Sequence, residues 1–361
     1  MVNKKIKILL LADMLANTRQ WVDGLERYGN AEVTVLELRN RNKLKRIAEW
    51  VNILFTIRKK LRKIQPDIVI GYRLTSYGFL AAWSGFKPCV LASQGITDVW
   101  PEHHWTTPMK AALARYAIKR AEMIHAWGAH MAVSIFELGA TEEQMFIMPR
   151  GIDTDIFSMP AGKENHTNGR TFKMCVTRGL YPEYNHLVIL KAIKKLVDEG
   201  FDIHLTIAGT GVEMDNIKAF ISANDLEKVV RLTGYIPNKE LPSLLQQSDI
   251  YLSMPSTEGV SASLLEAMSC GCFPIVSDIV ANRVLIRTGE NGYLVTLDDV
   301  DELCSKIKAV INNPDLFKNA VLENRNYVMR NASLKTNMPL FVEKYKELIL
   351  TKSKSVSRFA V

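Results

Sequence analysis

The chain alternates short apolar runs with amphipathic segments, and this alternation limits the folds that it can adopt. Segments with helical spacing of apolar residues occur at 17–28, 43–64 and 75–85. The apolar runs around them are rich in Val, Ile and Leu: IKILLLAD (6–13), EVTVLEL (32–38), DIVIGY (67–72) and CVLASQG (89–95). Because neighbouring parallel strands need a long crossover, usually a helix, this order predicts an α/β fold with a doubly wound parallel sheet.

The same pattern occurs a second time beyond a polar stretch, MPAGKENHTNGR, at residues 159–170. Strands are predicted at 172–179, 202–209, 229–235, 249–255 and 273–278, with helices at 186–198, 213–222, 239–247, 261–269 and 300–312. The polar stretch is typical of a linker between domains. We therefore predict two Rossmann-like lobes, 1–158 and 159–337, that face a central cleft. The chain of 361 residues is long enough to give each its own core.

Composition places the chain among folded proteins, with 47% hydrophobic and 23% charged residues. Its five cysteines are odd in number and show no paired framework, which favours a reducing compartment such as the cytoplasm. No apolar run approaches the roughly 20 residues that a transmembrane helix needs. The first residues, MVNKKIKILLLADML, resemble a signal peptide only superficially, because Asp13 interrupts a short run. They are better interpreted as the first buried strand.

Positive charge is concentrated in the first half of the chain. The net charge is +8, and residues 1–158 carry 22 Lys and Arg against 15 Asp and Glu. Much of it lies at 39–63, where apolar residues also recur at helical spacing. Two interpretations stay open: a core-packing helix pair with solvated lysines, or a basic surface that rests on anionic lipid. No nucleic-acid recognition motif accompanies the charge.

The segment MPSTEGVSASLLEAMSCGCFPIVSD, at 254–278, is the main candidate for a functional site. Leu264, Leu265 and Met268 recur at helical spacing, so a helix is predicted to begin near Ser261. The free N–H groups of a helix start bind phosphate without a metal. The residues at this start are Gly259, Val260, Ser261, Ala262 and Ser263. Carboxylates flank it at Glu258 and Glu266, and carboxylates accept hydrogen bonds from hydroxyls. Phosphate and hydroxyl groups together suggest a sugar nucleotide.

This segment resembles the motif of the family 4 glycosyltransferases, also called glycosyl transferases group 1, in which two glutamates are separated by seven residues. Further segments resemble other parts of the family pattern: 121–157, HLTIAGTGVEM (204–214), 230–256 and NGYLV (291–295). The resemblance implies a GT-B fold. It also implies a retaining enzyme that moves a sugar from a nucleoside diphosphate sugar to a hydroxyl of a glycan or lipid-linked oligosaccharide. A C-terminal helix, 338–361, would join the first lobe.

The resemblance also implies roles for single residues. Glu258 would bind the hydroxyls of the donor sugar, and Glu266 the ribose hydroxyls. Arg178 would hold the diphosphate, where a fixed cation stabilises the leaving group. Gly209 would line the nucleotide site, while Tyr235 and Ile236 would lie in the loop that touches the base. In the mechanism of the family, the leaving diphosphate accepts the proton of the acceptor, so catalysis is chiefly positioning.

The chain departs from the family pattern at three places. Where the family has a phosphate-binding Lys, this chain has Tyr184 or Asn185, and Arg150 or His186 is a candidate to replace the lost cation. Arg283 lacks the acidic neighbour that usually follows it. The family often has a His in the acceptor loop of the first lobe, which here reads ASQGITD. The acceptor contacts predicted there are Gln94, Gly95 and Asp98.

No metal or other cofactor is expected besides the nucleoside diphosphate sugar as co-substrate. Asp153 and Asp155 form an Asp-x-Asp pair, but they lie in a turn, RGIDTDIF, where Asp side chains commonly bond nearby backbone. Two other functions stay open. One is an epimerase or hydrolase of the GT-B fold, and the other is a non-catalytic protein that binds nucleotide sugars. The expected location is cytoplasmic, with the basic surface as a possible peripheral contact with the inner face of the membrane.

Overall fold

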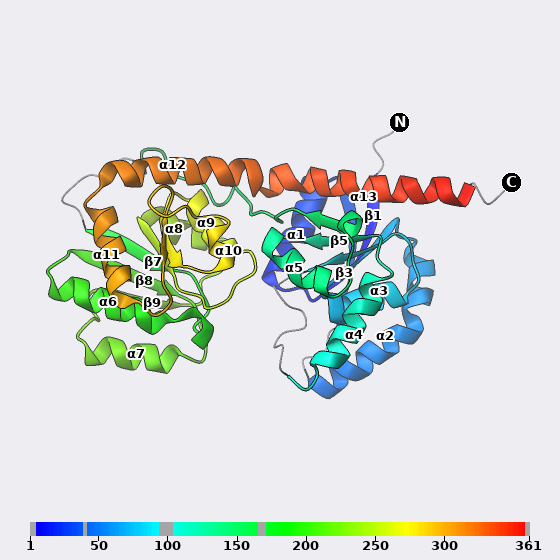
Figure 1. Cartoon of the computed structure of the whole chain (residues 1–361), viewed down its shortest axis with the longest axis horizontal. Coiled ribbons are helices and arrows are strands. Elements are labelled where there is room, and N and C mark those ends of the chain that lie inside the picture. Colours follow the sequence, from blue (N-terminus) through cyan, green and yellow to red (C-terminus); the bar gives the residue numbers. More distant parts are fainter. Residues whose placement is uncertain (1–4, 39–41, 94–103, 165–170, 358–361) are drawn as a thin grey trace. The chain divides into compact units, whose positions relative to one another are not determined.

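The computed structural model describes residues 5–38, 42–93, 104–164 and 171–357, and the chain forms two compact units (Figure 1). The first unit consists of residues 1–150 and 334–361, and the second of residues 151–333. The division between Arg150 and Gly151 precedes the predicted boundary at 158/159. Lys163, in the predicted linker, donates a hydrogen bond of 2.6 Å to the backbone carbonyl of Gln246, so this stretch packs on the second unit. The rest of the linker, 165–170, lies outside the described residues.

The first unit contains a six-stranded parallel sheet in the order β2-β1-β3-β4-β5-β6. Its strands are β1 (Ile6–Leu11), β2 (Ala31–Leu36), β3 (Ile68–Tyr72), β4 (Cys89–Ala92), β5 (Met123–Ala126) and β6 (Met145–Ile147). Its helices are α1 (Ala16–Arg27), α2 (Lys43–Ile64), α3 (Gly78–Trp83), α4 (Thr107–Ile118), α5 (Ala129–Glu137) and α13 (Leu334–Ser357). A π-helical turn, Arg73–Tyr77, precedes α3 and overlaps the start of the helix predicted at 75–85.

Aromatic residues fill the core of the first unit around His125 on β5. The His125 ring lies 4.3 Å from the ring of Phe341 on α13 and 6.1 Å from that of Trp21 on α1, measured between centroids. Its Nε2 bonds the backbone carbonyl of Met148 at 2.9 Å, and its Nδ1 has no partner among the described residues. Burial lowers the pKa of His125 to about 4, so the ring is neutral at physiological pH.

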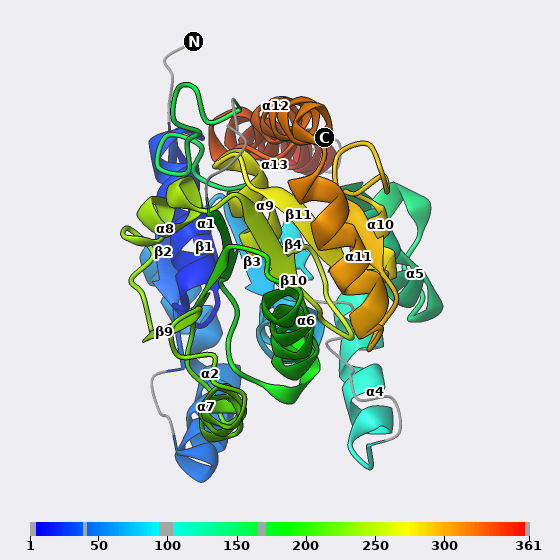
Figure 2. The ribbon, with the colours of Figure 1, turned by 90° about the vertical axis from the view of Figure 1, so that its left-hand side faces the viewer.

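The second unit contains another six-stranded parallel sheet, in the order β12-β11-β10-β7-β8-β9. Its strands are β7 (Phe172–Val176), β8 (Ile203–Ala208), β9 (Val230–Gly234), β10 (Ile250–Ser253), β11 (Phe273–Ser277) and β12 (Tyr293–Val295). Its α-helices are α6 (His186–Asp198), α7 (Met214–Ala223), α8 (Leu241–Gln247), α9 (Ala262–Ser269), α10 (Val280–Arg283), α11 (Val300–Ile311) and α12 (Pro314–Asn331). In Figure 2, α9 lies beside β10 and β11, which it contacts.

Helices cover both faces of this second sheet. Successive side chains of a strand point to opposite faces, so they enter two different cores. Met174 and Leu252 pack in one core with residues of α6, α7 and α11. Cys175 and Tyr251 pack in the other with residues of α8 and α9. Strands that are buried on both faces must be apolar throughout, and this explains the continuous apolar runs in the sequence. The predicted doubly wound α/β fold is thus confirmed in both units.

No element is predicted from the sequence at residues 314–331, where the structure has α12. The local signal was present: the Asn313 side chain caps the helix by accepting from Leu316 N at 3.0 Å, and Pro314 occupies the first turn. The other predicted helices begin and end within a few residues of the observed ones.

Candidate functional site

The candidate site lies where the strand order of the second sheet reverses. Along the chain the order runs outward from β7 to β8 and β9, and then returns to place β10 on the other side of β7. Ligands in open α/β sheets bind at the carboxyl ends of the strands at such a switch point. Arg178 follows the carboxyl end of β7, and Glu258 follows that of β10. The two residues are 80 positions apart in sequence, and the topology brings them together.

The helix that begins at the switch point is α9, with Ser261 as its N-cap, as the sequence predicted. The Ser261 hydroxyl accepts a hydrogen bond from Leu264 N at 3.3 Å, and it lies 3.2 Å from the hydroxyl of Ser263. Tyr251, on β10, donates to the Ser263 hydroxyl at 3.0 Å. Sequence reasoning missed Tyr251, because a tyrosine inside an apolar strand carries no local sign that its hydroxyl reaches a neighbouring helix.

Arg178 connects these groups. Its Nη1 donates to Ser263 Oγ at 2.8 Å and to Ser261 Oγ at 3.2 Å, and its Nη2 forms an ion pair with Glu258. The side chains of Arg178 and Glu258 are only 10% and 16% exposed. Burial opposes the charge of the guanidinium, but Glu258, Tyr251 and Tyr184 together outweigh burial, and the pKa of Arg178 is raised. The site therefore holds a fixed cation next to a helix start.

Several polar atoms beside Arg178 are buried and have no partner among the described residues. They are Arg178 Nε, the Thr177 hydroxyl and both ring nitrogens of His186. Most buried polar groups in folded proteins do have a hydrogen-bond partner. Unpartnered groups that cluster at one strand end are therefore typical of a place where a polar ligand binds. Thr177 was also missed by the sequence analysis, because threonine is common in strands.

Tyr184 and Asn185 are the two residues predicted to stand where the family has its Lys. The Arg178 guanidinium carbon lies 4.2 Å from the centroid of the Tyr184 ring. Asn185, the next residue, adopts a left-handed conformation with φ of 48° and donates through its side chain to the Met254 carbonyl at 3.0 Å. The pKa of Tyr184 is raised, mainly by burial. The ring thus supports the guanidinium from one side, where the family pattern would place a second cation.

One expectation about charge at this site was wrong. His186 does not replace the lost cation, because burial and the charge of Arg178 lower its pKa to about 4 and the ring is neutral. Arg283 lacks the acidic residue that usually follows it in the family, and it donates instead to Asp278, which precedes it, at 2.5 and 3.0 Å. Arg150 belongs to the first unit, where its buried guanidinium donates to the Asn17 carbonyl, so its role in phosphate binding stays a prediction.

The other predicted donor residues are also located in the second unit. Glu266 lies inside α9 and is 5% exposed. A Cβ atom at Gly209 would lie 2.1 Å from the Arg178 carbonyl, so only glycine allows this loop to approach the site. Tyr235 is 74% exposed after β9. Gly259, Val260, Ala262 and Ile236 are half-buried. The roles of all these residues in binding stay predictions.

The predicted acceptor contacts, Gln94, Gly95 and Asp98, lie outside the described residues. Within the described ranges, no group of three His, Cys, Asp or Glu residues is arranged to hold a metal. The Asp153 side chain accepts a hydrogen bond from Asp155 N at 3.0 Å. This local hydrogen bond belongs to the kind of turn that the sequence predicted for the Asp-x-Asp pair.

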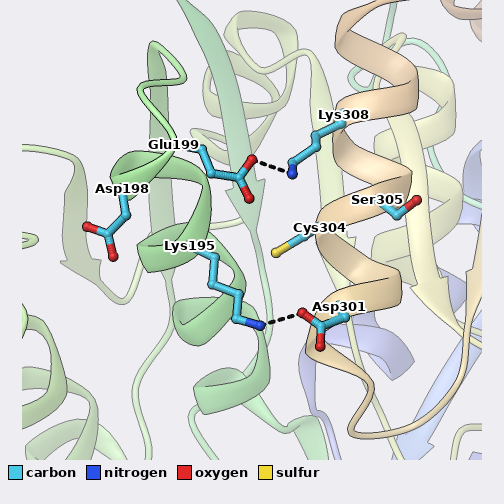
Figure 3. A pocket seen from close by; sticks show the side chains of 7 residues that line it. All are labelled: Lys195, Asp198, Glu199, Asp301, Cys304, Ser305 and Lys308. Carbon is cyan, nitrogen blue, oxygen red and sulfur yellow. Dashed lines mark hydrogen bonds and ion pairs between the residues drawn. The ribbon is translucent and has the colours of Figure 1, made fainter.

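A separate hollow of about 480 Å³ lies between α6 and α11 (Figure 3). Two ion pairs cross it, Lys195 with Asp301 and Lys308 with Glu199. Asp301 is 82% exposed, and exposed ion pairs of this kind contribute little to stability. Cys304 is buried at its base, and burial raises the pKa of its thiol. None of the predicted site residues lines this hollow, so it is not the candidate site.

One prediction concerns the stacking of Tyr184 on Arg178. Replacing Tyr184 by Leu should weaken binding of a nucleoside diphosphate about fivefold, because an aromatic ring over a cation stabilises it by about 1 kcal/mol. Tyr184→Phe keeps the ring and should stay within about twofold of the unchanged protein. Titration calorimetry with the nucleotide measures both variants. Equal losses of affinity in Tyr184→Phe and Tyr184→Leu would show that the hydroxyl, rather than the ring, contributes to nucleotide binding.

Comparison with known proteins identifies the family. The family model for glycosyl transferases group 1 matches residues 162–332, and the model for glycosyl transferase 4-like proteins matches residues 18–126. Together the two matches span more than half of the chain. They fall on the two units separately, with the first model on the unit that carries the Arg178 and Glu258 site.

Named relatives include glycosyltransferases. The chain is 24% identical, over 83% of its length and 80% of the relative's, to an Escherichia coli UDP-Gal:alpha-D-GlcNAc-diphosphoundecaprenol alpha-1,3-galactosyltransferase. It is 31% identical to a Mycobacterium tuberculosis phosphatidyl-myo-inositol mannosyltransferase, over 46% of this chain and 44% of the relative. That second match is thus confined to less than half of each protein.

Solved structures share the fold. Anabaena Alr3699/HepE, in complex with UDP and glucose, aligns with a TM-score of 0.75 at 15% identity, over 95% of this chain and 99% of that one. Sucrose-phosphate synthase from Thermosynechococcus elongatus aligns with a TM-score of 0.78 at 12% identity, over 96% and 100%. From the two family models and this fold, the chain belongs to the family 4 glycosyltransferases, enzymes of the GT-B fold.

Proposed function

We propose that this glycosyltransferase moves a sugar, with retention of configuration, from a nucleoside diphosphate sugar to a hydroxyl of a glycan or lipid-linked oligosaccharide. The observation that carries the proposal is the Arg178 cluster at the switch point of the second sheet. A charged guanidinium, a helix start and the Glu258 carboxylate lie together there, and Glu266 follows inside the same helix. These groups match the diphosphate, the sugar and the ribose of such a donor.

In this proposal, the donor diphosphate binds between Arg178 and the first turn of α9. The unpartnered Arg178 Nε and the free N–H groups of the helix start are its donors. Breaking the bond from the sugar to the diphosphate leaves a negative charge on the leaving group. A cation already fixed at that place stabilises the charge without reorganisation. The leaving oxygen then accepts the proton of the acceptor hydroxyl, so no separate protein nucleophile takes part.

Glu258 has two roles in this proposal. It pairs with Arg178 and holds the guanidinium in place, and its carboxylate also accepts hydrogen bonds from hydroxyls of the donor sugar. The carboxylate has two oxygens and about four lone-pair sites, so one partner does not exhaust it. Glu266, on α9, would accept from the ribose hydroxyls. No metal is part of this mechanism, because Arg178 and the helix start supply the positive field.

For the acceptor, we propose a lipid-linked sugar on the cytoplasmic face of a membrane. Support comes from two relatives whose names specify acceptors joined to a lipid, one a diphosphoundecaprenol derivative and the other phosphatidyl-myo-inositol. For the donor base, support comes from the complexes of a structural neighbour with UDP and with UDP-glucose. A uridine diphosphate sugar is therefore the first donor to test.

The test combines a donor screen with analysis of the product. Thermal shifts with uridine, guanosine and adenosine diphosphate sugars identify the donor, because a ligand that binds the native state stabilises it. Transfer to lipid-linked acceptors is then measured, and NMR of the new bond gives its anomeric configuration. Glu266→Ala should weaken donor binding at least about tenfold, since hydrogen bonds to a charged group contribute about 1.5–3 kcal/mol. Glu213→Ala, an acid outside the Arg178 cluster, is the matched control.

Three outcomes would contradict the proposal. An inverted product would exclude retention. Donor turnover at full rate without an acceptor would favour an epimerase or a hydrolase. Tight donor binding without transfer to any glycan or lipid-linked acceptor would favour a non-catalytic binding protein.

A further inference from the structure

Helix α2 carries two apolar stripes, and only one of them is buried. Ile53, Ile57 and Leu61 are 4%, 0% and 7% exposed and pack into the first unit. At 100° per residue these three side chains lie on one side of the helix. In Figure 1, α2 lies on the outside of the first unit next to α3, which it contacts. One stripe is therefore enough to explain how α2 packs.

The second stripe faces solvent. Leu44, Ile47, Val51 and Phe55 are 78%, 53%, 40% and 81% exposed. Their positions fall within about 80° of one another around the helix axis, roughly opposite Ile53 and Ile57. Single exposed apolar residues are common in proteins, but four in a row along one helix form a contiguous patch, which marks an interaction surface.

Cations follow the stripe toward the end of the helix, where Arg58 and Arg62 lie in line with it and Lys59 and Lys63 lie along one side. Residues 43–64 contain eight Lys and Arg and a single acid, Glu49. Five of the cations lie in the last two turns and are exposed: Arg58, Lys59, Lys60, Arg62 and Lys63. Among the described residues, no carboxylate pairs with any of these five. Arg46 differs, since it pairs with Asp13 at 2.7 Å on the side that faces the unit.

We infer that this outer face of α2, the exposed stripe with Arg58, Arg62 and the flanking Lys59 and Lys63, docks on a membrane surface rich in anionic phospholipid. The apolar side chains would enter the boundary between headgroups and acyl chains, and the cations would lie among the phosphates. A fluid layer of anionic headgroups matches a dense row of cations at any spacing. A folded protein partner would instead need carboxylates at fixed, complementary places. No helix within the described ranges is long and apolar enough to cross a membrane, so the contact is at the surface.

The experiment is co-sedimentation of the full chain with vesicles, without donor or acceptor. Vesicles of phosphatidylglycerol and phosphatidylcholine in equal amounts should bind the protein, and vesicles of phosphatidylcholine alone should bind it far less. Leu44→Ser with Phe55→Ser should lower the partition coefficient at least about tenfold, because each side chain loses its apolar burial. The matched control is Val212→Ser with Leu350→Ser, which removes two equally exposed apolar residues elsewhere.

The charges are tested separately. Lys59→Ser with Lys63→Ser should lower partitioning about twentyfold, since each basic residue near an anionic surface contributes about fivefold in affinity. Lys218→Ser with Lys318→Ser, exposed lysines on α7 and α12, should leave partitioning unchanged. Circular dichroism checks that each variant is folded.

Three results would overturn the inference. The first is equal binding to both vesicle types. The second is equal binding by the α2 variants and their controls. The third is a dimer in solution that Phe55→Ser dissociates, because the stripe would then be covered by a second copy of the chain. Vesicle binding is read without any transfer reaction, so failure here leaves the proposed function standing, and failure of that function leaves this inference standing.

Discussion

Arg178→Ala is expected to lower the rate of sugar transfer by about a hundredfold to a thousandfold, the range found when one preorganised charge-stabilising donor is removed from an active site. Arg178 is the charged group that bonds both Ser261 and Ser263 at the start of α9. Neither His186, which is neutral, nor the Tyr184 ring can replace its charge at the leaving group. Steady-state rates at saturating donor measure the effect.

The loss of Arg178 also leaves Glu258 without its ion-pair partner, next to the place proposed for the diphosphate. Donor binding should therefore weaken in Arg178→Ala through repulsion as well as through lost attraction. The double variant Arg178→Ala/Glu258→Gln removes the repulsion, and it should recover part of the binding but not the rate. Coupling of this kind is the mark of two residues in direct contact.

Arg283→Ala is the matched control, because Arg283 also pairs with an acid but its side chain, on α10, is 58% exposed. It should stay within about twofold of the unchanged rate. A rate for Arg178→Ala within tenfold of the unchanged protein would contradict the site. So would additive effects of the Arg178 and Glu258 changes on donor binding.

Stability should fall steeply when the pH is lowered from 6.5 to 4. Burial lowers the pKa of both His125 and His186 to about 4 in the folded chain, against an unfolded value of 6.5. Between these values the unfolded state binds protons that the folded state does not, so protonation favours unfolding. The contribution of each neutral histidine is complete above pH 6.5 and is lost as the pH falls through this window. The change is roughly 3 kcal/mol for each histidine.

Urea denaturation at several pH values measures how the free energy of unfolding changes with pH, which is the slope in question. Tryptophan fluorescence is the probe. All six tryptophans lie within residues 1–150, so the fluorescence reports the first unit and therefore His125. His125→Phe should flatten the slope, since the ring is already surrounded by aromatic side chains such as Phe146 and Phe341. The exposed His104 is the control position, and His104→Asn should leave the slope unchanged. A steep slope that persists in His125→Phe would contradict the assignment.

Most of the elements, α12 excepted, and their order follow from local sequence patterns. Apolar runs of strand length separated by helical segments specify parallel strands with crossovers, because local periodicity reflects which faces of an element are buried. For the same reason the start of α9 could be located at Ser261, since capping depends on residues within one turn. The two glutamates were located by their places beside this helix start, while their separate roles and that of Arg178 came from family resemblance, which needs only short ordered motifs.

Which distant residues meet, and what charge they carry, follows from the packing of elements that are far apart in the sequence. The pairing of Arg178 with Glu258 depends on β7 and β10 lying side by side, which no local pattern encodes. The neutral state of His186 depends on burial by the surrounding fold. Periodicity revealed apolar residues around much of α2, yet only packing decided that Ile57 is buried and Phe55 is exposed. Burial and long-range pairing are properties of the assembled chain, because they arise from contacts between elements.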